Sequence, residues 1–214
     1  MSKFNVYKND IPANLKANSE IMAIDTETMG LNLDRDRLCV FQFSFGDGIA
    51  HIVHFEHGND YAAPNLREFL NNDEIVKLFH YARFDVLAIK KYFGITLENI
   101  YCTKIASRLA RTYSNRHSLK ALVSEFTQIR MDKTQQSSWW GCDNLSREQI
   151  EYAASDVLFL HEIMCKLNII LEREKRLRLA RDCFAFLTVR TELDDLGFGR
   201  FDIFQHEDDP TQGN

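Results

Sequence analysis

The chain has 214 residues, of which 45% are hydrophobic and 27% are charged, and its formal net charge is −5. This length supports one folded domain, and the composition is that of an ordinary globular protein. The acidic balance argues against an extensive non-specific grip on nucleic acid, because such a grip needs many Lys and Arg residues to neutralise phosphates. It leaves open a short anionic substrate held by metal ions.

Other classes of protein are excluded by local features of the sequence. No apolar stretch reaches the roughly 20 residues of a membrane helix, so we expect no membrane association. The N-terminus lacks a basic segment followed by an apolar core, so no signal peptide is expected. The five cysteines contain no Cys-x-x-Cys pair, which argues against zinc and redox motifs and favours the reduced thiols of a cytoplasmic protein.

Short apolar runs predict the strands of an α/β fold. Residues 1–20 are polar and predict an edge segment that leads into a buried strand at 21–24. Further strands are expected at 38–45 and 49–55, joined as a hairpin through Gly46-Asp47-Gly48, and then at 75–79 and 100–102.

Helical periodicity covers most of the remaining chain. Helices are predicted for residues 65–70, 82–93, 103–112, 118–126, 146–171 and then up to about 196. Pro64 suits the first turn of the first helix, Gly94 the end of the second, and Ser146 to Gln149 form a capping-box pattern. Residues 131–144 lack periodicity and are rich in hydrogen-bonding groups, which predicts a loop.

Two carboxylates follow the strand at 21–24. Asp25 and Glu27 are two residues apart, so in an extended chain they point to the same side. Carboxylates this close repel each other and are costly to desolvate unless a cation lies between them, and Mg²⁺ prefers oxygen ligands. The alternative is a strand that simply ends in two solvated acids.

Two further acids lie in contexts that favour a shared site. Asp85 is predicted in the first turn of a helix that follows a strand, although the helix dipole alone can account for an acid there. Tyr152 and Asp156 are four residues apart on one helix face, within an otherwise apolar stretch. A lone buried Asp156 would prefer to be neutral, and a metal reverses that preference. Tyr152 at this spacing is also compatible with an ordinary core position.

The three segments together resemble the exonuclease motifs of the DEDD superfamily. Asp25-Thr-Glu27, Asp85 after His80, and Tyr152-x-x-x-Asp156 match these motifs, and the tyrosine marks the branch that includes ribonuclease D. The supporting stretches are 36–40, 102–107, 111–117, 135–138 and 150–156. The chain is most similar to the short bacterial nano-RNase C family, and the resemblance extends to about residue 204.

The resemblance implies a fold, a domain boundary and a metal site. It implies a ribonuclease H-like exonuclease fold, with a mixed central sheet flanked by helices and a helical C-terminal part. Residues 1–204 would form a single 3′-5′ exonuclease domain, and 205–214 a disordered tail. Two divalent cations, Mg²⁺ or Mn²⁺, would be held by acids in a two-metal hydrolysis of phosphodiesters. In this scheme Asp25 bridges both ions, Glu27 and Asp156 complete the nucleophile side, Asp85 holds the leaving-group side, and Tyr152 orients the attacking water.

The same resemblance implies very short RNA as substrate, especially 5′-phosphorylated dinucleotides such as pGpG. Leu31 occupies the position of a wedge leucine that inserts between bases, and plain core packing is the alternative. His80 either closes a strand end or contacts the terminal sugar. The 5′ phosphate would be bound by hydroxyl, amide and guanidinium donors, although these residues could instead only order a loop: Arg116, Gln135, Gln136, Ser137 and Ser138.

Two rival functions remain open. One is a ribonuclease D-type enzyme that trims the 3′ ends of structured RNA, and the other is a non-catalytic nucleic-acid-binding scaffold on the same fold. A basic groove for long RNA is not evident, although residues 173–181 could supply one. Apolar faces of the C-terminal helices fit a subunit interface, and the resemblance implies a homo-oligomer, in the form of a ring-shaped octamer.

Overall fold

The computed structural model describes residues 3–131, 134–135, 137–200 and 203–204. Six strands form one sheet in the order β1-β4-β3-β2-β5-β6. Their bounds are Lys3–Lys8 (β1), Ile21–Thr28 (β2), Leu38–Ser44 (β3), Ile49–His54 (β4), Val76–Phe79 (β5) and Ile100–Cys102 (β6). β2 pairs antiparallel with β3 and parallel with β5, so the predicted mixed sheet is confirmed.

The central position of β2 follows from its sequence. Met22, Ala23 and Ile24 are completely buried, which suits a strand covered on both faces. The strand is longer than predicted, because it continues through both acids to Thr28 and ends in a bulge between Glu27 and Thr28. β1 lies at an edge of the sheet, as expected for the N-terminal segment, and pairs only with β4, to which it is parallel.

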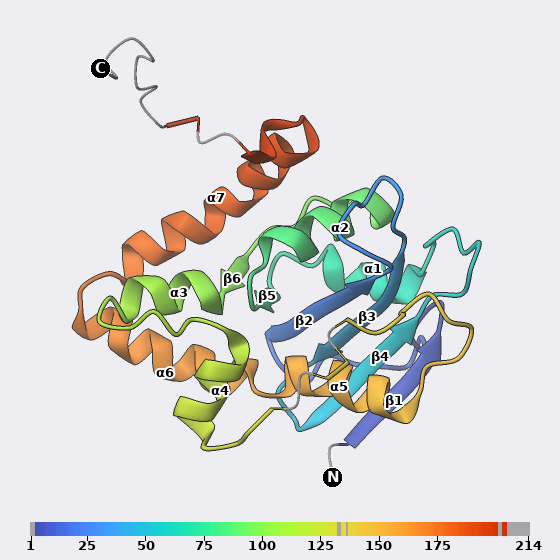
Figure 1. The fold of residues 1–214 in the computed structure, drawn as a ribbon, viewed down its shortest axis with the longest axis horizontal. Coiled ribbons are helices and arrows are strands. Elements are labelled where there is room, and N and C mark those ends of the chain that lie inside the picture. Colours follow the sequence, from blue (N-terminus) through green and yellow to red (C-terminus); the bar gives the residue numbers. More distant parts are fainter. Residues whose placement is uncertain (1–2, 132–133, 136, 201–202, 205–214) are drawn as a thin grey trace, which may run out of the picture.

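Helices cover the sheet and extend beyond it on the side of β6 (Figure 1). Their bounds are Pro64–Leu70 (α1), Arg83–Phe93 (α2), Thr103–Ala110 (α3), Leu119–Thr127 (α4), Arg147–Leu158 (α5), Leu160–Arg173 (α6) and Leu177–Asp195 (α7), followed by a 3₁₀ turn at Phe198–Arg200. α5 packs across β2, β3 and β4, whereas α7 packs against α2, α3 and β6. The predicted helical C-terminal part is therefore confirmed, and the predicted tail at 205–214 lies outside the described residues.

The predicted continuous helix from 146 to 171 is wrong. α5 ends at Leu158 and α6 begins at Leu160, with Phe159 between them at φ −100° and ψ −7°. No Gly or Pro marks this break, and the apolar periodicity continues through it, so the pattern alone predicted one helix. The break lets α5 lie on the sheet while α6 packs against α3 and α4.

A turn separates α6 from α7. α6 ends at Arg173 and is capped by Glu174. The N–H of Arg176 donates to the carbonyl of Leu171, and the N–H of Lys175 donates to that of Glu172. These are the two bonds of a Schellman motif, and Lys175 has the left-handed φ of 56° that the motif requires. Glycine normally occupies this position, so a lysine there gave no warning of the turn.

One hydrophobic core joins the sheet to its helices. All five cysteines are free thiols. Within the described ranges no helix is both long enough and apolar enough to cross a membrane.

Candidate active site

Asp25 and Glu27 project from one face of β2, as predicted, and both are half-buried. Thr26 and Thr28 alternate with them and are buried. The two acids lie near the end of a central strand, so the sheet fixes their backbone positions before any ligand binds.

Gln42 on β3 positions the carboxylate of Asp25, and it was not among the site residues predicted from the sequence. It lies directly opposite Asp25 in the β2–β3 register, and its Nε2 donates to Asp25 Oδ2 at 2.6 Å. Its side chain is completely buried. An amide donor to a carboxylate favours the ionised form of that carboxylate. A lone glutamine inside an aromatic strand that pairs with the acidic strand is the feature that could have revealed it.

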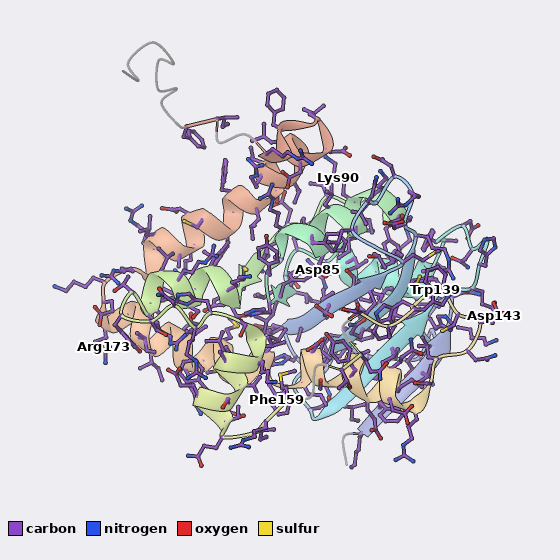
Figure 2. The ribbon with its side chains drawn as sticks, viewed as in Figure 1. Asp85, Lys90, Trp139, Asp143, Phe159 and Arg173 are labelled. Carbon is purple, nitrogen blue, oxygen red and sulfur yellow. The ribbon has the colours of Figure 1, made fainter. Side chains whose placement is uncertain are left out.

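Asp85 reaches β2 from the first turn of α2 (Figure 2). β2 pairs with β5 only as far as Ala23, so beyond that point this edge of β2 needs another acceptor. Asp85 Oδ1 accepts hydrogen bonds from the N–H of Thr26 at 3.0 Å and from its Oγ1 at 2.7 Å. The bonds tie this carboxylate to the residue between Asp25 and Glu27.

Tyr152 and Asp156 lie one turn apart on α5, and both are buried. The helix begins with the predicted capping box of Ser146 and Gln149. The ring centroids of Trp140 and Tyr152 are 6.0 Å apart, so the indole packs against the phenol ring. Asp156 is in the last turn of α5, where the partial negative charge of the helix C-terminus disfavours a carboxylate, so a cation is needed there.

The structure brings three of the predicted acids together. Asp25, Glu27 and Asp156 each offer one carboxylate oxygen, and these oxygens all lie within 4.8 Å of one another. Three carboxylates at this separation repel strongly unless a cation lies among them, and hard divalent ions take such ligands. The donor set therefore fits a divalent-cation site. Asp85 is not in this group of three but lies close enough for the Asp156 charge to affect it.

Asp85 and Tyr152 both have pKa values raised by their surroundings in the site. Burial raises the pKa of the Asp85 carboxyl to about 7, although the hydrogen bonds from Thr26 lower it, and the charge of Asp156 raises it further. Burial also raises the pKa of the Tyr152 hydroxyl well above its usual value, and nearby Asp156 adds to this. Tyr152 therefore keeps its proton at neutral pH, which suits a hydrogen-bond donor and not a base.

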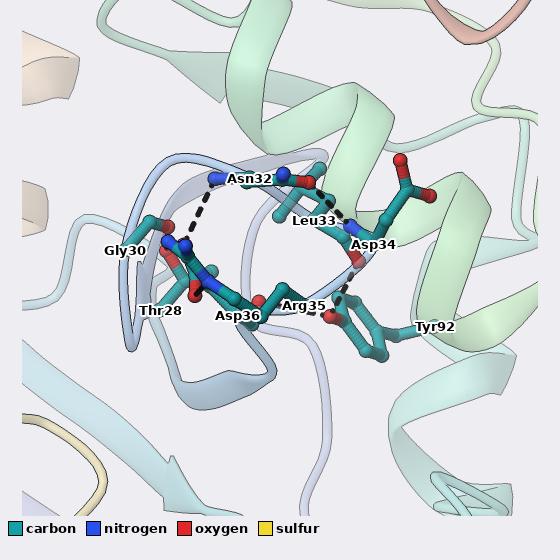
Figure 3. Close-up of polar contacts among 8 residues, drawn as sticks. All are labelled: Thr28, Gly30, Asn32, Leu33, Asp34, Arg35, Asp36 and Tyr92. Carbon is teal, nitrogen blue, oxygen red and sulfur yellow. Dashed lines mark hydrogen bonds and ion pairs between the residues drawn. The ribbon is translucent and has the colours of Figure 1, made fainter.

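Leu31 stands on a braced loop at the end of β2. Its side chain is 87% exposed, which excludes the alternative of core packing. The loop around it is fixed by polar contacts (Figure 3): Asp36 Oδ2 accepts from the N–H of Asn32 at 3.0 Å, and Tyr92 Oη donates to the carbonyls of Leu33 and Asp36. A Cβ at Gly30 would lie 2.3 Å from Asp36 Oδ2, so only glycine permits this approach.

His80 lies at the end of β5, and its Nδ1 is 2.9 Å from Thr103 Oγ1. Because the Thr103 hydroxyl donates to the carbonyl of Phe79, we infer that the ring donates from Nδ1. The next residue, Tyr81, has a left-handed φ of 69°. Strained backbone of this kind clusters at functional sites. Here it turns the chain from β5 into α2, and so toward Asp85.

The loop before α5 is anchored by Gln149. Its Nε2 donates to Ser138 Oγ at 3.0 Å and to the carbonyl of Trp139 at 3.1 Å. Ser138 thus orders the loop, as its alternative interpretation required. Ser137 is exposed and Gln135 half-buried, whereas Gln136 lies outside the described residues.

Arg116 lies on a different element from the acids. It is exposed just before α4 and lines a surface hollow of about 630 Å³ together with His117, Lys120 and Arg130.

Comparison with known proteins defines the class. A family model described as a 3′-5′ exonuclease matches residues 8–172. The chain belongs to this 3′-5′ exonuclease family, whose members need divalent metal ions, and the predicted ribonuclease H-like fold, enzyme class and divalent cofactor are confirmed.

Within that class the chain is similar to two solved NrnC structures and to a ribonuclease D sequence. Brucella melitensis NrnC bound to pGG is 45% identical, with a TM-score of 0.92, and the match covers 97% of this chain and 100% of that one. Brucella melitensis NrnC with bound Mg²⁺ is 44% identical, with a TM-score of 0.90 and coverage of 96% and 100%. The ribonuclease D of Acidiphilium cryptum is 32% identical over 178 residues, which cover 81% of this chain and 45% of that protein. The chain thus spans about half the length of such relatives.

Proposed function

We propose that this chain is a metal-dependent 3′-5′ exoribonuclease that hydrolyses very short RNA to mononucleotides, with a preference for 5′-phosphorylated dinucleotides such as pGpG. The observation that carries the proposal is the match of the whole chain to a protein solved with pGG, at 45% identity. Residues 1–204 would act as one exonuclease domain in the cytoplasm.

In the proposed mechanism, Asp25, Glu27 and Asp156 would hold divalent cations together with Asp85 on the leaving-group side. When bound, these cations would supply positive charge to the attacking and leaving oxygens of the phosphodiester. Gln42 keeps the Asp25 carboxylate in place. Tyr152 would orient the attacking water through its hydroxyl, which remains protonated.

Two features of the structure support a short substrate. The braced loop presents Leu31 to solvent beside the strand that carries the acids, so an inserted side chain would not have to be ordered on binding. His80 would contact the terminal sugar from the end of β5. For the 5′ phosphate we propose Ser137, Gln135 and Arg116, with Gln136 and Ser138 as further donors.

The proposal is tested by substrate length. At physiological ionic strength, about 0.15 M, we expect kcat/KM for a 5′-phosphorylated dinucleotide to exceed that for a seven-residue RNA by at least about tenfold, a difference of about 1.4 kcal/mol. Single-turnover hydrolysis of two-, three- and seven-residue RNAs at matched concentrations measures this. Equal rates, or faster trimming of a structured RNA 3′ end, would instead favour a ribonuclease D-type function.

Leu31→Ala should separate substrate binding from stability. The side chain is exposed, so its truncation should leave the melting temperature unchanged, while KM for a dinucleotide rises by about tenfold, as expected for the loss of one apolar contact of about 1–2 kcal/mol. Ile169→Ala is a matched control, because Ile169 is 67% exposed on α6. If both variants keep the wild-type KM, Leu31 does not contact the bases.

We further propose that the chain forms a homo-oligomer, with a ring-shaped octamer as the expected form. Leu179 and Val189 are exposed on α7, and Leu196 and Phe198 follow at its end. Apolar side chains gathered on one helix are a feature of subunit interfaces.

A further inference from the structure

Two segments of this acidic chain are basic, residues 103–131 and residues 173–181. Residues 103–131 contain six Lys and Arg residues and a single acid, for a net charge of +5, so the rest of the chain carries −10. The segment forms α3, α4 and the connection between them, which lie together beyond the β6 edge (Figure 1). Buried Arg111 is ion-paired with Glu125. The five remaining cations are called the basic strip: Lys104, Arg108, Arg116, Lys120 and Arg130.

The basic strip differs from the other charged surfaces of the molecule. None of its five cations has an ion pair with an acid in the described part of the chain, and all but half-buried Lys104 are exposed. Elsewhere cations commonly pair with an acid one helical turn away, as Arg147 does with Glu151 and Arg178 with Asp182. Unpaired, exposed cations are available to an external anion without breaking an existing contact.

The strip is continuous in space. Lys104 and Arg108 are one turn apart on α3, and the pKa of Lys104 is lowered by burial and by the nearby charge of Arg108. His117 lies within range of both charges. Next to His117, the hollow of about 630 Å³ is lined by Arg116, Lys120 and Arg130.

One end of the strip begins at the candidate active site. Thr103, the first residue of α3, contacts His80 at 2.9 Å. The Nζ of Lys104 lies 3.9 Å above the centre of the Tyr81 ring, and Tyr81 begins the turn that leads to Asp85. The cations therefore lead away from the end of β5 along α3 and then α4.

We propose that the basic strip binds the phosphate backbone of a single RNA strand whose 3′ end occupies the acid cluster; this inference rests on the proposed function. Phosphates are contacted by Lys and Arg together with hydroxyl and amide donors, and Ser118, Ser124 and Asn115 line the same hollow. A dinucleotide whose 5′ phosphate lies at Arg116 is too short to reach Lys120 and Arg130 as well, whereas a longer RNA is not. The preference for dinucleotides is therefore salt-dependent: it narrows at low salt, where the strip holds longer strands, and widens as salt screens the strip.

The test compares Lys120→Ala/Arg130→Ala with the wild-type chain on a 5′-phosphorylated dinucleotide and on a seven-residue RNA across a salt series. For the seven-residue RNA we expect kcat/KM at low salt to fall by roughly tenfold, as for two lost ionic contacts. The slope of log kcat/KM against log salt should become shallower by about 1.4, or 0.7 for each contact. The dinucleotide should keep its kcat/KM within about twofold, since an exposed contact that it never makes contributes nothing.

Arg173→Ala/Arg178→Ala is the control, because it removes two exposed cations that already pair with acids. The proposal is overturned if the control pair lowers kcat/KM equally, or if kcat/KM for the seven-residue RNA is unchanged in the strip variant. It is also overturned if kcat/KM for the dinucleotide falls in parallel. Fluorescence anisotropy of a labelled seven-residue RNA with the Asp156→Asn chain measures strip binding without cleavage. Loss of this binding in the strip variant supports the strip even if the wild-type chain cleaves no dinucleotide, which would refute only the proposed function.

Discussion

Asp156→Asn is expected to lower Mg²⁺-dependent hydrolysis of a dinucleotide by at least about 10³-fold, which corresponds to about 4 kcal/mol of transition-state stabilisation. Asp156 contributes one of three carboxylate oxygens that lie within 4.8 Å of one another. Asparagine keeps the shape of the side chain but removes the charge that a divalent cation needs. Steady-state rates in Mg²⁺ and in Mn²⁺ measure the effect, and activity within tenfold of wild type would contradict the metal site.

For Asp156→Asn we expect thermal stability to be kept or increased, in contrast to the loss of activity. Without metal, the melting temperature should stay the same or rise, because the buried charge of Asp156, which lies at a helix C-terminus and repels Asp25 and Glu27, is gone. Added Mg²⁺ or Mn²⁺ should stabilise the wild-type chain but not the variant. Asp182→Asn is a matched control, since that exposed acid on α7 pairs with Arg178 and lies away from the acid cluster. A variant that simply misfolds would lose stability in both conditions.

The part of the site that could be predicted from sequence is the part that depends on local spacing. Two residues along a strand and four along a helix place side chains on the same side whatever the rest of the fold does. Asp25 with Glu27 and Tyr152 with Asp156 are such pairs. That these two pairs would face each other could not follow from periodicity, because it depends on how α5 packs across β2 and β3.

The contacts that hold the acids in place could not be predicted from spacing along the sequence. Gln42 reaches Asp25 through the register of a hairpin, and Asp85 reaches Thr26 across 59 residues. Both contacts exist because β2 separates from β5 after Ala23 and pairs with β3 from Ala23 to Thr28. A sequence without known pairing contains the partners but not the register.

The overall charge also concealed an important feature. The net charge of −5 is the sum of +5 in residues 103–131 and −10 in the rest of the chain. The sum argued against a nucleic-acid-binding surface, whereas the local charge of residues 103–131 favours one. From the sequence, residues 173–181 were the one stretch named that could supply a basic groove. There Arg173 pairs with Glu174 and Arg178 with Asp182, so two of the five cations in that stretch are already paired with acids.

Tyr152→Phe should reduce kcat for a dinucleotide by about 10²-fold and leave KM nearly unchanged. The ring contact with Trp140 does not need the hydroxyl, so the aromatic packing and the fold should persist. The pKa of Tyr152 is raised by burial and by Asp156, so the wild-type hydroxyl is a donor at neutral pH and its loss removes orientation of the attacking water. The stabilisation by Mg²⁺ should remain, which distinguishes this variant from Asp156→Asn.

Tyr101→Phe is the control for removing a buried tyrosine hydroxyl. Tyr101 is as buried as Tyr152, and its Oη donates to Asn168 Oδ1 at 2.9 Å on the α6 side of the sheet. Its loss should lower stability by about 1 kcal/mol, the usual net value of one hydrogen bond, with kcat unchanged. If Tyr152→Phe and Tyr101→Phe reduce kcat equally, the hydroxyl of Tyr152 supports only the fold. A kcat loss confined to Tyr152→Phe, with metal binding retained, assigns it to the water that attacks the phosphodiester.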